Sequence, residues 1–165
     1  MPSKFSSTCS IFLCLTSIVW GGNWAHWRGP AGNGSSPDAK PPIEWSATKN
    51  VKWKVPVPGR GSGSPVIWEN KVFVVSAVAA KGGRGFDGER LSKLAFKLFC
   101  FDRETGKILW QKTAITATPH QGTHSTNGFA SASPCTNGKH VYAHFGSRGL
   151  YCYTMDGELV WKRDD

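Results

Sequence analysis

An internal repeat limits what this chain can fold into more than any other feature of its sequence. The segment 98–112 reads LFCFDRETGKILWQK, and the segment 150–163 reads LYCYTMDGELVWKR. Both contain an aromatic residue, a cysteine, a second aromatic residue, an acidic residue with glycine, and then tryptophan, in the same order. Each copy therefore predicts a strand, a tight turn and a second strand.

The repeated unit extends upstream of this hairpin. The pair Ser64-Pro65 precedes one short apolar segment, and the pair Ser133-Pro134 precedes its counterpart. Trp53, Trp110 and Trp161 lie roughly 50 residues apart, which is the period of propeller blades. We therefore expect an all-β fold, a β-propeller built of four-stranded antiparallel blades.

Turn residues and apolar runs place four strands in each unit. Thr105-Gly106, Asn137-Gly138 and Asp156-Gly157 favour the positive-φ turns that join strands. The run Val72–Val75 is apolar on both faces, which indicates a strand covered on both sides. The expected strands are Ser64–Trp68, Lys71–Val78, Leu98–Asp102, Lys107–Lys112, Ala130–Cys135, His140–Phe145, Leu150–Thr154 and Glu158–Lys162.

The length of 165 residues is too short for a closed ring, because a propeller needs at least about four blades. We expect about two to three blades, in the N-terminal part of a larger protein. The expected domains are a signal peptide at 1–21 and an incomplete propeller at 22–165, with repeats at about 51–112 and 113–163.

The first residues resemble an export signal. Lys4 is followed by the mostly apolar stretch Cys9–Trp20 and by the small residue Gly21, which predicts cleavage near Gly21 to Gly22. About twelve apolar residues are too few to cross a bilayer, although an uncleaved anchor is the alternative. The expected location is therefore outside the cytoplasm: periplasmic, cell-surface or secreted.

The cysteines do not form a disulfide framework. Cys100, Cys135 and Cys152 follow the leader, and an odd number in an exported chain argues against paired bridges. Cys100 and Cys152 occupy equivalent repeat positions, so we expect buried small hydrophobic residues there.

The net charge of +9 raises the question of an acidic partner. The basic residues are scattered, and the densest groups, Lys52 with Lys54 and Lys162 with Arg163, fall where strand alternation sends them to solvent. This pattern favours a solvated face over nucleic-acid binding and is compatible with peripheral membrane association.

Two segments interrupt the repeat, Ala80–Lys93 and Thr113–Gly128, and both are predicted to be loops. The second carries His120, His124 and Asn127 as candidate loop-face residues. No carboxylate stands beside them to complete a zinc site, so a metal-free loop is expected.

The tryptophan-terminated units, the Asp102-x-x-Thr-Gly106 turn and the paired Ser-Pro starts resemble the PQQ-like β-propeller repeat proteins. This family includes quinoprotein dehydrogenases and the propeller subunit of the outer-membrane β-barrel assembly machinery. The segments 23–30 and 124–134 look like exported bacterial members of the family. The expected structural signature of the repeat comprises Trp53, Ser64, Pro65, Asp102, Gly106, Trp110, Ser133, Pro134, Asp156, Gly157 and Trp161.

The resemblance implies a complete ring of about seven or eight blades, whose remaining blades would be needed for closure. It also implies that the early strand Val51–Val55 completes the blade formed by the far end of the chain. The same repeat serves enzymes and scaffolds, so the resemblance indicates a fold and leaves function open.

A quinone site of the family resembles a planar acid held by a tryptophan stack, cationic side chains, calcium and an adjacent cysteine pair. This chain has no adjacent cysteines, and its carboxylates form no calcium pattern. Arg60 and Arg148 are either funnel-lining or solvated charges. We therefore expect no catalytic residue, no metal ligand and no cofactor here; cofactor-binding positions stay unknown.

The favoured function is an exported scaffold that binds a protein or another extracytoplasmic ligand. The sequence does not decide whether the protein is an enzyme. The alternative is a PQQ-dependent oxidoreductase of alcohols or sugars, with calcium, whose active-site residues lie beyond Asp165.

Overall fold

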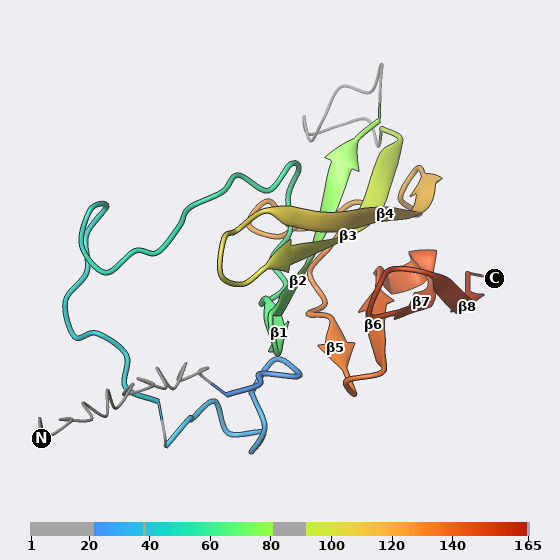
Figure 1. The fold of residues 1–165 in the computed structure, drawn as a ribbon. Helices are drawn as coiled ribbons and strands as arrows, with labels where there is room; N and C mark the ends of the chain where they lie inside the picture. The colour runs from blue at the N-terminus through green and yellow to red at the C-terminus, as the bar shows by residue number, and fades with distance from the viewer. Residues whose placement is uncertain (1–21, 38, 81–91, 165) are drawn as a thin grey trace, which may run out of the picture.

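A computed structural model describes residues 22–37, 39–80 and 92–164, which form two four-stranded antiparallel sheets (Figure 1). The strand orders are β1-β2-β3-β4 and β5-β6-β7-β8. The predicted all-β fold of four-stranded antiparallel blades is confirmed. The elements are β1 (Val66–Trp68), β2 (Lys71–Ala79), β3 (Leu94–Asp102), β4 (Ile108–Ala117), β5 (Cys135–Thr136), β6 (His140–His144), the 3-10 helix η1 (Gly146–Arg148), β7 (Leu150–Thr154) and β8 (Leu159–Arg163).

The expected signal peptide at 1–21 and most of the expected loop at 80–93 lie outside the described residues. Within the described part of the chain, no helix is long and apolar enough to cross a membrane.

The hairpin of β3 and β4 is longer than the sequence predicted. β3 starts at Leu94 instead of Leu98, and β4 continues past Lys112 to Ala117, where Leu94 pairs with Ala117. The segment expected to be a loop from Thr113 therefore begins as strand. Alternating burial of Leu94, Phe96 and Leu98 against the second sheet explains the extension.

The first strand of each sheet is shorter than predicted. β5 covers only Cys135–Thr136 instead of Ala130–Cys135, since Pro134 has no N–H for a ladder. The carbonyl of Ala130 instead accepts the N–H of Ser62, at 3.0 Å, from the neighbouring unit. This part of the chain bonds across the two units and forms no ladder with its own sheet.

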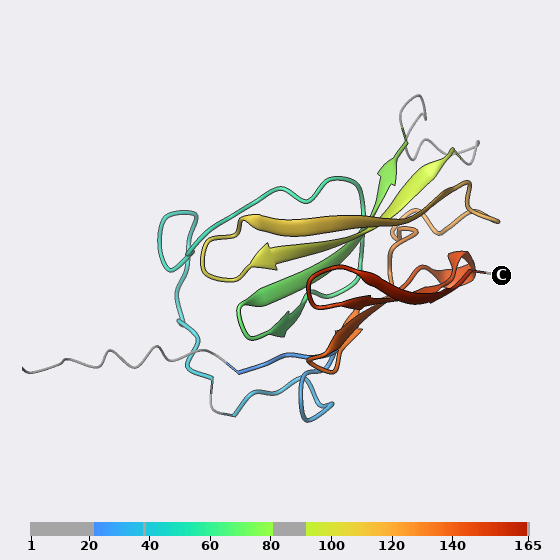
Figure 2. The ribbon, with the colours of Figure 1, turned by 45° about the vertical axis from the view of Figure 1, so that its right-hand side comes forward.

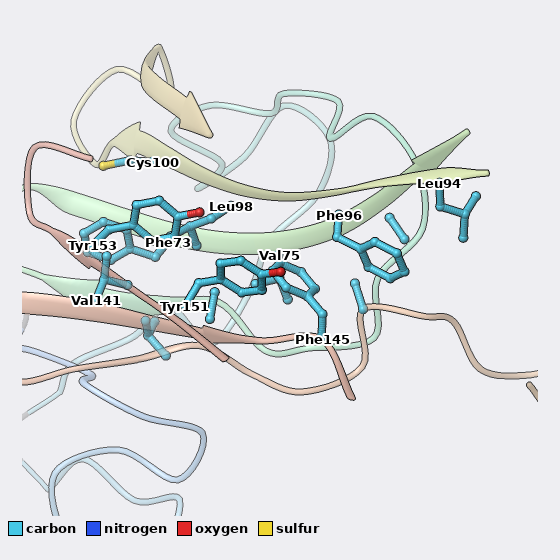
Figure 3. Packing of buried hydrophobic residues seen from close by; sticks show 14 residues of the cluster. Phe73, Val75, Leu94, Phe96, Leu98, Cys100, Val141, Phe145, Tyr151 and Tyr153 are labelled. Carbon is cyan, nitrogen blue, oxygen red and sulfur yellow. The ribbon is translucent and has the colours of Figure 1, made fainter. Parts of the chain in front are cut away.

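One hydrophobic core lies between the two sheets (Figure 3). Phe73 and Val75 of β2 point into it from the first sheet, and Tyr151 and Tyr153 of β7 meet them from the second. Val72 lies on the opposite face of β2 and packs in a second cluster. The prediction that this apolar run is covered on both sides is confirmed.

Trp110 joins the first sheet to the second. It leaves β4 and donates its indole N–H to the carbonyl of Met155, at 3.1 Å, in the β7–β8 turn. Its ring lies against buried Gly157 of that turn, and its centroid is 5.8 Å from the ring of Phe73. A buried turn glycine is required here, because any side chain would meet the indole.

Trp53 makes the same kind of contact one unit earlier. Its indole N–H donates to the carbonyl of Arg103 at 2.8 Å, and its ring lies over Gly106 in the β3–β4 turn. Among the described residues, Trp53 and Trp110 thus each pack on the acidic-glycine turn that comes roughly 50 residues later in the chain. The tryptophan and the turn glycine of the repeat are therefore the residues through which its parts pack on one another.

The aspartates of these turns hold hydrogen bonds that lower their pKa values. Asp102 accepts from the hydroxyl and the N–H of Thr105, each at 2.7 Å, and from Asn70 at 2.5 Å. The Thr105 hydroxyl contributes most to the lowered pKa of Asp102. Asp156 pairs with Lys71 of the first sheet at 2.7 Å, and that hydrogen bond lowers the pKa of Asp156.

We expect acid to weaken the fold through these two carboxylates. A carboxyl whose pKa is lower in the folded state stabilises the protein above its unfolded pKa, and this stabilisation is lost as the pH falls through the folded pKa. Thermal unfolding of the full-length protein, followed by circular dichroism, should therefore show a midpoint that falls below about pH 4.

A Lys71→Met variant is the control for this acid effect. It removes the partner of Asp156, so the decrease in the midpoint between neutral and acidic pH should become smaller. A midpoint that stays constant into acid in the unsubstituted protein would contradict the assignment.

The last strand leaves apolar side chains at the surface. Leu159, Val160 and Trp161 of β8 are 52%, 47% and 41% exposed, and within the described part of the chain β8 pairs only with β7. Open strand edges and contiguous apolar surface favour association between chains. We therefore expect residues 22–165 alone to form oligomers or aggregates in size-exclusion chromatography with light scattering.

The matched variant for this prediction is the double substitution Leu159→Lys and Val160→Lys, which should reduce the association. A cooperatively unfolding monomer of residues 22–165 would instead mean that two sheets suffice for a stable domain.

Candidate functional site

Two hollows lie at the end of the sheets opposite the tryptophan-packed turns. In Figure 2 the β3–β4 and β7–β8 turns point to the left, whereas the chain after β4 and the β6–β7 connection lie to the right. The loop after β4 carries the residues that the sequence indicated as a loop face. This end is the candidate functional site.

The inner hollow, of about 240 Å³, lies between Gly59–Ser62 and Thr126–Gly128. Glycine permits the close backbone approach that forms it: a Cβ at Gly61 would stand 2.5 Å from the carbonyl oxygen of Val75. Arg60 and Asn127 line the hollow. It therefore offers polar groups on a backbone that is held tightly in place.

The Ser-Pro pairs lie at this junction of the two units. The N–H of Ser64 donates to the hydroxyl of Ser133 at 2.8 Å, so the two starts contact each other. Pro134 is buried, whereas Pro65 is exposed. These residues position the hollow and present no reactive group to it.

The three loop residues singled out from the sequence do not form one cluster. The Nδ1 atom of His124 lies 2.9 Å from the hydroxyl of Thr126 in the same loop. The side-chain oxygen of Asn127 accepts from the Ser131 hydroxyl at 2.6 Å. These contacts fix the shape of the loop beside the inner hollow.

His120 lies in the second, outer hollow. Its Nδ1 atom is 2.8 Å from the hydroxyl of Ser147 in η1. Arg148, the next residue of η1, lines the same hollow together with His144. Ser147 and His144 were not predicted from the sequence, and Arg148 was expected to be either a funnel-lining or a solvated charge; the GSRG break before β7 was the available signal.

The described donor groups do not fit a calcium and quinone site. Asp102 is occupied in its own turn, and Asp156 is paired with Lys71. Among the described residues, no three His, Cys, Asp or Glu side chains lie close enough together to hold a metal ion. No catalytic step is assigned to such a group in this part of the chain.

The three described cysteines are free thiols. Cys100 is buried beside Trp110 in the sheet register, and Cys152 is buried beside Trp161 at the equivalent position. Burial raises the pKa of Cys100 to about 12, so its thiol stays protonated at neutral pH. The expectation of small buried residues at these two positions agrees with this environment.

The two four-stranded sheets, the first joined by Trp110 to a turn of the second, have the architecture of blades of a PQQ-like β-propeller. The family model described as "Outer membrane protein assembly factor BamB" matches residues 42–164. The chain therefore belongs to this family of PQQ-like repeat proteins.

Solved structures with significant similarity include a europium-containing methanol dehydrogenase, at 15% identity and a TM-score of 0.32. The match covers 64% of this chain and 25% of the dehydrogenase, so the chain spans about a quarter of that protein's length. No curated protein is significantly similar to the chain.

Proposed function

We propose that the chain is part of an exported β-propeller that binds a protein, or another extracytoplasmic ligand, as a non-catalytic scaffold. The observation that carries this proposal is that the residues shared by the repeats already make structural contacts. Trp53, Trp110 and Asp102 are committed to contacts within and between units. Specific binding is therefore assigned to the loop end, where the side chains differ from one unit to the next.

The family supports a protein partner. Its description refers to an assembly factor for outer membrane proteins, which is a role carried out by contact with other proteins. The exposed stretch from His120 to Asn127 provides polar groups for such contact. Export, by the leader at 1–21, would bring the chain into the compartment where such partners lie.

The alternative is an oxidoreductase that binds PQQ with calcium and oxidises alcohols or sugars. Its active-site residues would lie outside this chain. The contacts of Asp102 and Asp156 count against a calcium site in the described residues. Both classes share the ring, so a measurement of ligand binding on the complete protein is needed to separate the two functions.

A titration of PQQ and calcium chloride into the full-length protein separates these functions. The scaffold function predicts no saturable binding below about 100 µM and no dye reduction above background with alcohols or aldoses. Micromolar PQQ binding together with dye reduction would replace the scaffold proposal with the enzyme.

Site-specific photo-crosslinking in envelope extracts tests the binding end directly. A crosslinker in place of His124, in the exposed loop, should yield a discrete protein adduct. The control position is Glu104, which is exposed on a turn at the opposite end of the sheets. Equal adducts from both positions would contradict binding through the loop end.

A further inference from the structure

The outer hollow is a cavity of about 340 Å³ between the ends of the two sheets. Its polar wall consists of His120 from the loop after β4, His144 from the end of β6, and Ser147 with Arg148 from η1. None of the described Asp or Glu residues lines it. A cavity whose ionisable residues are one arginine and two histidines is complementary to an anion.

Arg148 is held in the cavity wall by the protein backbone. One guanidinium nitrogen donates to the carbonyl of Thr118, in the segment that leaves β4. The Nε atom is buried and has no acceptor among the described residues. Because the Nε atom has no exposed surface, a ligand would contact the outer nitrogens of the guanidinium; Arg148 as a whole is only half-buried and lines the cavity.

His120 and η1, which form part of the polar wall, are also held in place. The contact between His120 Nδ1 and the Ser147 hydroxyl, at 2.8 Å, joins the loop to η1. The hydroxyl of Tyr151 donates to the carbonyl of Arg148 at 3.0 Å, which ties η1 to β7. Groups from two units therefore meet in a fixed arrangement, as a preformed ligand site requires.

The inner wall of the cavity is aromatic. Phe96 and Phe145 both line it, and their rings pack edge to face with centroids 5.5 Å apart. Phe96 belongs to β3 and Phe145 directly follows β6, and both are almost fully buried in the core that joins the two units. Phe129 also lines the cavity and is only half-buried, so an apolar ligand body of about one ring can pack against it while the charged end stays at Arg148.

We propose that this cavity binds a small organic carboxylate, with the carboxylate at Arg148 and His120 and the apolar body against Phe129. Guanidinium groups favour carboxylates because the planar fork matches two oxygen atoms. The volume is at the lower end of the range for small-molecule sites, about 300 Å³, which limits the ligand to a low molecular mass. The proposal goes beyond the protein partner proposed above and shares His120 with that contact surface.

Benzoate is the probe, because it combines one aromatic ring with one carboxylate. Isothermal titration of the full-length protein should show saturable benzoate binding with a Kd below about 1 mM. Benzamide has nearly the same shape without the charge, and it should bind at least about tenfold more weakly, which corresponds to roughly 1.4 kcal/mol.

Two substitutions locate the site. Arg148→Gln should weaken benzoate binding at least tenfold, and Arg148→Lys should restore only part of it, because lysine keeps the charge without the fork. His120→Ala should weaken binding several-fold, whereas His124→Ala, in the same loop but outside this cavity, should leave it unchanged. Unaltered circular dichroism spectra confirm folding, and His120→Ala keeps the test decisive if Arg148→Gln does not fold.

Three results would overturn the proposal. The first is an absence of saturable binding at benzoate concentrations up to 10-fold above the expected Kd. The second is equal affinity for benzoate and benzamide. The third is benzoate binding that is unchanged in both the Arg148→Gln and the His120→Ala variants. Inorganic phosphate that binds as tightly as benzoate would also overturn it, since the site would then recognise anions in general and not carboxylates with an apolar body.

Discussion

Replacement of Trp110 by alanine should lower the free energy of unfolding of the full-length protein by about 3 kcal/mol, the range for emptying a large aromatic site. The loss has two sources. The indole packs against Phe73 and the Gly157 turn, and removing it leaves space between the two sheets. The carbonyl of Met155 also loses the indole N–H that it accepts at 3.1 Å. Urea unfolding followed by fluorescence and circular dichroism measures the change.

Trp45→Ala is the matched control, because Trp45 is 71% exposed. Its cost should stay within about 0.5 kcal/mol, as for other exposed positions. If the two substitutions cost the same, the contact of Trp110 with the next unit does not hold the sheets together.

Trp161 adds a second comparison in the same protein. It is 41% exposed within this chain, although its repeat position matches that of Trp110. If a further unit packs on Trp161 in the complete protein, Trp161→Ala should cost as much as Trp110→Ala. A much smaller cost would show that the stacking rule ends at β8.

Much of this fold could be predicted from the sequence because the strands and turns of the repeat depend on the types and spacing of neighbouring residues. The turn at Asp156-Gly157 needs positive φ, which glycine provides, and Gly157 has a φ of 88°. The apolar run of β2 indicated burial on both faces, and its alternate side chains enter two different clusters. Such signals need only residue type and spacing.

Other features depend on tertiary contacts and left no local signal. The Ala130 segment looked like a strand, but its carbonyl bonds to Ser62 of the preceding unit. The outer hollow needs residues from β6, η1 and the loop after β4 to converge. His120 and His124 are close in sequence, yet one contacts Ser147 of η1 and the other contacts Thr126 of its own loop.

The residues that hold the two sheets together and the residues that line the candidate site lie at opposite ends of the sheets. Repeat residues build the interface between the sheets at one end, where Trp53 and Trp110 donate to carbonyls of the turns. Residues that differ between units, such as His120 and Arg148, gather at the other end. Because the two ends are built from different residues, substitutions at the loop end can change binding without removing the contacts that hold the units together.

Gly157→Ala should destabilise the full-length protein by roughly 3 kcal/mol, the sum of a backbone cost and a packing cost. The φ of 88° is unfavourable for a residue with a Cβ. That Cβ would lie 2.9 Å from an atom of the Trp110 indole, which the Met155 carbonyl holds in place. Gly146→Ala is the control, because Gly146 also has positive φ but nothing within 4 Å of a Cβ; it should cost only about 1 kcal/mol.

The double variant Trp110→Ala with Gly157→Ala separates the two costs, because removal of the indole removes the clash but not the backbone strain. The two single effects should therefore fail to add, with the double variant less destabilised than their sum by about 1 kcal/mol or more. Urea unfolding of the four proteins of the cycle measures this coupling. Additive effects, together with equal costs for Gly146→Ala and Gly157→Ala, would mean that the turn needs glycine for its backbone alone and that the tryptophan contact places no constraint on it.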